Sequence, residues 1–345
     1  MNNRLSNIEL LRMIAMFAII LGHFWGHGLQ SVDEIAGTKE ADILSFLTSF
    51  LTCHVNLFLL ITGYFGIKFR WKGIISLTIK ILFYSLTIYF GYLLITGNKF
   101  TFDAFIRRFL FFCRMSPWWF IESYIYLYLF SPLINRVIEP LNKTQYQKVL
   151  VLLLFINVII GGLFRSQQIG VTGFCFQHFA LMYCIGGYIR RFGLFSKQSN
   201  FTLIAIWFFG SICQYILEDY WPWRGYVNPL VILTAISVFV LFSRIKLKSH
   251  TINWIAAGSF AVYLLHDEDT ILRHCYVELM KQIYYLNNTI WVYASLAFVT
   301  AIVWFTVAIL IDHVVMHFLS PIESLLINND LIKYVNKKIN QYAKE

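Results

Sequence analysis

Long apolar runs constrain this chain more than any other feature, because they fill most of its length. A helix needs about 20 mainly apolar residues to cross a bilayer, with a range of about 17 to 25. By this measure we predict spans at 8–26, 43–67, 73–96, 118–138, 148–164, 174–190, 201–217, 227–243, 253–272 and 289–316. The sequence therefore predicts an all-α polytopic membrane protein with about ten transmembrane helices.

The predicted organisation is a membrane domain over 1–320 and a cytoplasmic amphipathic tail over 321–345, which forms a C-terminal interfacial helix. Composition agrees with it: 58% of the residues are hydrophobic and 13% are charged, against about 25% charged in soluble domains. The six cysteines lie in or beside apolar runs and show no metal or disulfide spacing. We interpret them as small buried side chains.

The net charge of +10 comes from Lys and Arg clustered between the apolar runs, which indicates membrane orientation rather than binding to nucleic acid. Both termini are then cytoplasmic in a multi-pass protein of the cell membrane. The short loops on the cytoplasmic side hold Lys68, Arg70, Lys72, Arg136, Lys143, Lys148, Arg190, Arg191, Lys197, Arg244, Lys246 and Lys248. One exception is the basic segment 97–117, which lies outside by parity. It either lies on the outer leaflet as an amphipathic segment or lines a polar site.

Two ionisable residues lie within the first predicted span. Arg12 and His23 are eleven positions apart, which is about 1100° of helix, or roughly 20° beyond three turns. They therefore share one face, separated by roughly 16 Å along the axis. Ionisable groups in spans mark functional sites by default, but Arg12 could equally snorkel to headgroups while His23 lies at the interface.

Further polar residues occur at the outer ends of other spans, and we predict that they border a cavity open to the outside. They are Glu122, Gln177, His178, His266, Asp267 and Glu268. For four tryptophans an interfacial aromatic belt is favoured over stacking on a sugar ring: Trp118, Trp119, Trp221 and Trp223. We interpret His54, His313 and His317 as satisfied or interfacial. No motif for a phosphate loop, a zinc protease or a serine hydrolase is present, and we expect no metal.

Five segments, in order along most of the chain, resemble the membrane acyltransferase-3 family. The first pairs a basic residue with a His after ten intervening positions, here Arg12 and His23. The third carries a Trp-Phe-Ile to Ser-Pro-Leu-Ile-Asn pattern typical of Gram-positive members. The segments are RLSNIELLRMIAMFAIILGHF (4–24), VNLFLLITGYFGIK (55–68), PWWFIESYIYLYLFSPLIN (117–135), FALMYCIGGYIRR (179–191) and WIAAGSFAVYLLHDE (254–268).

This resemblance implies O-acyl transfer from a cytoplasmic acyl-CoA, usually acetyl-CoA, to a hydroxyl of a cell-surface or lipid-linked glycan. The acyl-CoA is a substrate, and no cofactor is implied. Many members carry paired arginines at the start of the third span to hold the donor. Here Arg70, Lys72 and Lys80 occupy that region, and Lys holds phosphate as a point charge instead of a fork.

The resemblance also implies the catalytic roles. His23 would take the acceptor proton or carry the acyl group briefly, and Arg12 would orient the donor or stabilise charge along the path. Glu122 and Asp267 are the candidates to orient His23, and His266 is a further supporting residue.

Two other functions remain open from the residues alone. One is a transporter or flippase for a glycolipid or anion, which an intramembrane Arg and His would serve equally well. The spans show no obvious pair of broken helices that would favour it. The other is a non-catalytic part of a polysaccharide export complex.

Overall fold

The computed structural model describes residues 5–30, 38–110, 118–170, 172–217, 225–268, 271–287 and 289–328, together with Tyr334. Every regular element in these ranges is a helix, which confirms the all-α prediction. In chain order they are α1 (Ser6–Gln30), α2 (Lys39–Ser49), α3 (His54–Phe65), α4 (Trp71–Thr96), α5 (Phe102–Phe109), α6 (Trp119–Ile138), α7 (Lys143–Leu154), the π-helical η1 (Phe155–Leu163), α8 (Phe176–Phe192), α9 (Asn200–Leu217), the short 3₁₀ turn η2 (Gly225–Val227), α10 (Pro229–Ser243), α11 (His250–Ala257), α12 (Ser259–His266), α13 (Leu272–Asn287) and α14 (Ile290–Ile327).

Six stretches of helix in the described ranges are long and apolar enough to cross a membrane, so the chain is a multi-pass membrane protein. They are α1, α2 with α3, α4, α7 with η1, α9 and α14. The other four predicted spans correspond to α6, α8, α10 and α11 with α12, and the prediction of about ten is not confirmed. Most residues of α8 and half of α10 are buried among other helices. Such helices present little surface to lipid and need fewer apolar residues.

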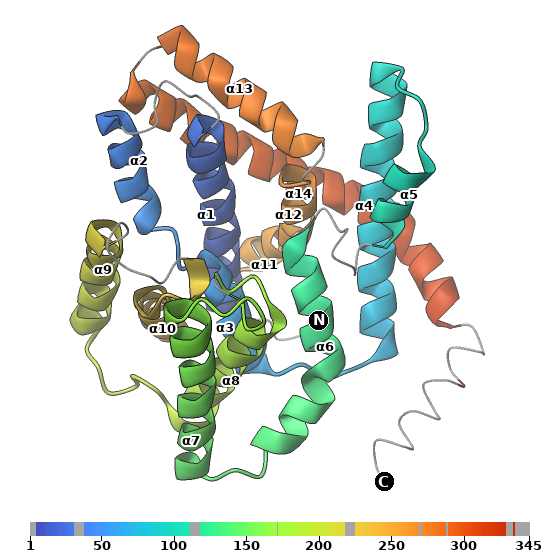
Figure 1. Ribbon diagram of the computed structural model, residues 1–345. Helices are drawn as coiled ribbons and strands as arrows, with labels where there is room; N and C mark the ends of the chain where they lie inside the picture. The colour runs from blue at the N-terminus through green and yellow to red at the C-terminus, as the bar shows by residue number, and fades with distance from the viewer. Residues whose placement is uncertain are drawn as a thin grey trace.

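Helix α1 lies at the centre of the bundle. It packs against α3, α11, α13 and α14, and also touches α2, α10 and α12 (Figure 1). Its first turn is tied to the loop before α11, because the hydroxyl of Ser6 accepts from the amide N–H of Ser249 at 3.0 Å. A polar group on α1 therefore meets side chains from distant parts of the chain.

Helices α3 and α8 approach closely because glycines face each other across their contact. A Cβ atom on Gly63 would collide with the backbone carbonyl of Tyr183, and one on Gly186 would collide with the carbonyl of Leu60. Small residues of this kind let membrane helices touch along their backbones. The face of α3 that carries Val55, Phe58 and Ile61 lines the cavity described below.

Two of the predicted spans are broken. The span predicted at 43–67 divides into α2 and α3, where the hydroxyls of Ser49 and Thr52 bond to carbonyls three and four residues earlier. Such bonds compete with the helical ladder. The span predicted at 253–272 divides at Gly258, which lies against Ile309 of α14, and ends at His266. A separate helix that the sequence did not predict, α13, begins at Leu272.

Helix α14 continues through Pro321 to Ile327, so the expectation that it ends before this proline is wrong. At 38 residues and about 1.5 Å per residue it is longer than a bilayer core of about 30 Å, and it runs obliquely across the bundle (Figure 1). Pro321 is exposed, so its ring meets little packing. Of the predicted tail over 321–345, residues 321–327 continue α14, and the residues after 328 lie outside the described ranges, apart from Tyr334.

Candidate active site

A cavity of about 310 Å³ lies beside α1, and both Arg12 and His23 line it. The shared face predicted from their spacing is therefore present. Arg12 is the only Arg or Lys among the described residues that line the cavity. The remaining lining residues are mainly apolar and aromatic side chains from α1, α3, α4, α6, α11 and α12, with Tyr226 of η2: Met16, Ile19, Val55, Phe58, Ile61, Thr62, Leu77, Trp119, Phe120, Tyr124, Tyr226, Ala256, Ala257, Ser259, Phe260 and Tyr263.

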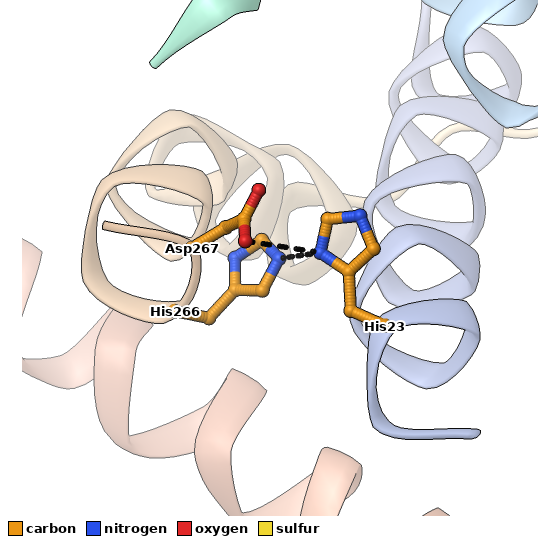
Figure 2. Close-up of side chains that lie close together, drawn as sticks. All are labelled: His23, His266 and Asp267. Carbon is orange, nitrogen blue, oxygen red and sulfur yellow. Dashed lines mark hydrogen bonds and ion pairs between the residues drawn. The ribbon is translucent and has the colours of Figure 1, made fainter. Parts of the chain in front are cut away.

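At one end of the cavity His23 meets the C-terminal end of α12. The Nδ1 atom of His23 lies 3.1 Å from Nε2 of His266 and 3.6 Å from Oδ1 of Asp267. Figure 2 shows both neighbours on the same side of the His23 ring, with the second ring nitrogen turned away from them. The structure thus brings three predicted site residues together across 243 positions of sequence.

The hydrogen bonds determine the tautomers of the two neutral histidines. Nδ1 of His266 lies 2.9 Å from the carbonyl of Val262, and a carbonyl only accepts, so this nitrogen carries the proton. Nε2 of His266 is then an acceptor, and Nδ1 of His23 must donate to it. The lone pair of His23 is consequently on Nε2, the nitrogen directed away from His266 and Asp267. His23 can therefore act as a base through the lone pair on its Nε2 atom.

Asp267 is held by Arg273, whose Nε and Nη2 both donate to Oδ1 at 2.9 and 2.8 Å. The carboxylate side chain is 2% exposed. A buried carboxylate needs such charged partners. Asp267 therefore provides a fixed negative charge beside His23, which would stabilise an imidazolium formed during proton transfer. Sequence reasoning missed Arg273, because nothing in its spacing from Asp267 distinguishes it from an ordinary loop cation.

The loop that carries Asp267 is anchored by its neighbour Glu268. One carboxylate oxygen of Glu268 accepts from Arg108 at 3.2 Å, and the other accepts from the amide of Ile271 at 2.6 Å, next to the start of α13. Arg108 and Glu268 are both buried. Arg108 comes from α5, a helix that packs beside α4 (Figure 1).

This contact bears on both interpretations of the basic segment 97–117. Arg107 is exposed and pairs with Asp103 of its own helix, whereas Arg108 turns inward to the loop behind the site. The segment supports a polar site as well as forming a surface helix. Residues 111–117, which include Arg114, lie outside the described ranges.

Away from His23, Arg12 donates to Glu9 at 2.7 Å, and its side chain is 29% exposed. Free snorkelling to headgroups does not describe it, because it lines the cavity and has a carboxylate partner.

Other predicted site residues lie elsewhere. Glu122 accepts a hydrogen bond from Tyr126 on its own helix, α6, and it is not among the described residues that line the cavity. Lys80 forms an ion pair of 2.7 Å with Asp312 of α14, which also accepts from Tyr84. Arg70 and Lys72 are exposed at the start of α4. The structure therefore leaves Asp267 as the carboxylate beside His23.

The aromatic residues near the site are not an interfacial belt. Trp118 is fully buried, and Trp119 lines the cavity and stacks on Tyr226 at 5.9 Å between ring centroids. Trp221 and Trp223 lie outside the described residues.

The three histidines that we interpreted as satisfied or interfacial lie in different surroundings. His313 bonds to the carbonyl of Trp254, and His317 is exposed. His54 is buried with its ring 5.8 Å from that of Tyr226.

Ligand atoms of His23, His266 and Asp267 lie within 4.8 Å of one another, a spacing that a metal ion could use. The donor set argues against a divalent cation, because Oδ1 of Asp267 already accepts two hydrogen bonds from Arg273. A metal bound to that oxygen would face a guanidinium in direct contact.

The comparisons with known proteins give one match. The sequence profile of the acyltransferase-3 family, described as an acyltransferase domain, matches residues 5–311. The chain belongs to this family. Neither the curated proteins nor the solved structures gave a match. For a membrane acyltransferase, a histidine base at the end of an intramembrane cavity is chemically appropriate, since acyl transfer to a hydroxyl requires removal of its proton.

Proposed function

We propose that this acyltransferase moves an acetyl group from cytoplasmic acetyl-CoA to a hydroxyl of an extracytoplasmic or lipid-linked polysaccharide. The supporting observation is the single cavity with Arg12 and His23 on its wall, separated by roughly 16 Å along α1. An acyl-CoA has an anionic nucleotide and a long arm of alternating apolar and amide groups that ends in the thioester. A cation near one end, apolar walls and a base at the other end match that order.

Exposed basic residues near the cytoplasmic end of the cavity, in the predicted orientation, would receive the nucleotide. Arg70 and Lys72 at the start of α4 are exposed. Arg190 and Arg191 are less suitable, because each donates to backbone carbonyls at the C-terminal ends of α3 and α6. Lys80 is also less suitable, because its charge is balanced by Asp312.

The reaction would proceed by direct attack. The acceptor oxygen bonds to the thioester carbonyl carbon while Nε2 of His23 takes the hydroxyl proton. The carbon–sulfur bond then breaks, and the proton passes from His23 to the departing sulfur. The products are an O-acetyl ester and the CoA thiol. Asp267, 3.6 Å from His23, would stabilise the transient imidazolium.

A transporter or flippase is the alternative that the fold favours most. The breaks between α2 and α3 and between α11 and α12 place discontinuous helices beside the cavity, a feature that the sequence analysis did not anticipate and that transporters use. The chemistry of the products separates the two functions, since a transporter leaves acetyl-CoA intact.

The experiment supplies purified protein in lipid nanodiscs with acetyl-CoA labelled in the acetyl group and a polysaccharide acceptor. We expect the wild type to transfer label. His23→Ala should lower the rate by about 10² or more, the usual contribution of a positioned general base, and remain inserted. His313→Ala is the matched control, because His313 lies outside the residues lining the cavity. Intact acetyl-CoA after incubation with wild type and acceptor would contradict the proposal.

A further inference from the structure

Helix α12 presents a row of polar groups to the cavity. Ser259 and Tyr263 both line it, and they are one helical turn apart on the same face. His266, three residues further on, contacts His23. The row therefore leads along the cavity toward the base.

The hydroxyl groups of Ser259 and Tyr263 are buried and make no hydrogen bond to the described part of the chain. The two residues are 1% and 6% exposed. The backbone of Phe120 lies near the Tyr263 hydroxyl but outside hydrogen-bonding geometry. Buried hydroxyls are normally paired, and an exception in a native protein requires an explanation. A ligand in the cavity would provide the missing partner.

The ring of Tyr263 is held in place by its neighbours. It packs edge-on against Phe120 and His266, with ring centroids 5.8 and 6.0 Å away. A hydroxyl on a fixed ring, in the same cavity as His23 and unpaired within the described part of the chain, is preorganised to bind an atom that gains negative charge.

We propose that Tyr263 is a catalytic residue that donates a hydrogen bond to the carbonyl oxygen of the bound thioester. This inference rests on the proposed function and adds an oxyanion-stabilising group to it. Ser259 lies one turn nearer the donor's entry and would bind the arm of the acyl-CoA.

In the proposed step, the acceptor oxygen forms a bond to the carbonyl carbon and its proton moves to Nε2 of His23. The carbonyl π electrons move to the carbonyl oxygen, which becomes an anion and accepts from the Tyr263 hydroxyl. When this anion collapses, the carbonyl re-forms, the carbon–sulfur bond breaks, and the sulfur takes the proton from His23. Tyr263 keeps its own proton throughout.

Tyr263→Phe tests the role, because it removes the hydroxyl and keeps the ring. We expect kcat to fall by about 10² to 10³, as for loss of one oxyanion donor, while acetyl-CoA binding and thermal stability stay near those of the wild type. Tyr146→Phe is the matched control. It removes a buried hydroxyl that bonds to the carbonyl of Cys184, away from the cavity, and should retain wild-type kcat.

The outcomes separate this inference from the proposed function. Normal transfer by Tyr263→Phe, in a background where the wild type transfers and His23→Ala does not, would overturn the role of Tyr263 alone. Weaker acetyl-CoA binding with unchanged kcat would also overturn it, because the hydroxyl would then bind the ground state. A wild type that never consumes acetyl-CoA would remove both proposals. If Tyr263→Phe fails to fold, Tyr263→Met takes its place. Met also lacks the hydroxyl donor, its flexible side chain can fill the space between Phe120 and His266, and the variant should be equally impaired.

Discussion

At the residue scale, the state of His23 depends on two neighbours with different tasks. His266 accepts from Nδ1 and thereby determines the tautomer, while Asp267 supplies a negative charge. Arg273 keeps that carboxylate in place through two hydrogen bonds. The arrangement differs from a simple His–Asp pair, because the shorter contact of His23 is to a second imidazole.

Asp267→Asn separates charge from shape at this position. The amide keeps the volume and one acceptor oxygen for Arg273, but the charge that stabilises an imidazolium on His23 is lost. We expect kcat for acetyl transfer to fall by about 10² or more, with acetyl-CoA binding preserved. Asp103→Asn is the control, since Asp103 is exposed and pairs with Arg107 of its own helix, α5. Equal rates for wild type and Asp267→Asn would exclude Asp267 from the mechanism.

At the element scale, polar contacts and close approaches hold helices together where the apolar effect is weak. Lipid is as apolar as the side chains, so packing and hydrogen bonds drive helix association. The glycines between α3 and α8 allow close packing of these two helices. Lys80 and Tyr84 provide hydrogen bonds between helices, since both side chains of α4 bond to Asp312 of α14.

We predict that the ion pair of Lys80 and Asp312 stabilises the folded protein. Asp312→Asn should lower the free energy of unfolding by about 3–5 kcal/mol, because it leaves a mostly buried cation without its partner. The double variant Lys80→Met with Asp312→Leu should recover most of the loss. Thermal unfolding in detergent measures both. A double variant as unstable as Asp312→Asn would contradict the structural role of the pair. A stable double variant that no longer binds acetyl-CoA would show that Lys80 also binds the acyl donor.

At the scale of the whole molecule, function depends on which face of the bundle meets the cytoplasm. The proposed donor path enters near Arg12 and ends at His23, so acetyl-CoA can reach the site only if the N-terminal end of α1 is cytoplasmic. Clustered Lys and Arg in alternate loops predict this orientation. The side from which acetyl-CoA enters the cavity can be tested by measuring the orientation of the chain in the membrane.

Single cysteines introduced into a variant without native cysteines test the orientation. Lys39 at the start of α2 and Lys246 before α11 are both exposed. We expect Lys39→Cys to react with an impermeant thiol reagent on intact cells. Lys246→Cys should react only after the cells are opened. The reverse pattern would place the entrance of the donor path outside and would exclude a cytoplasmic acyl-CoA as the donor.

The sequence by itself determined the features that depend on local geometry. Apolar runs are read directly as membrane helices, because an unpaired backbone cannot lie in lipid. The eleven-residue spacing places Arg12 and His23 on one face because the helical period is a property of the backbone. The same local patterns made the family resemblance visible.

Only the tertiary structure decided which polar groups meet. His266 and Asp267 are grouped with Glu122 by their predicted depth, yet only the first two reach His23, because α12 ends against α1 and α6 does not. Three further ion pairs also depend on the tertiary structure. Asp312 of α14 pairs with Lys80 of α4. Arg108 of α5 pairs with Glu268 after α12, and Arg273 pairs with Asp267 across a turn. Charges in a membrane protein are paired by how helices pack, and side chains far apart in sequence carry no periodic signal of that packing.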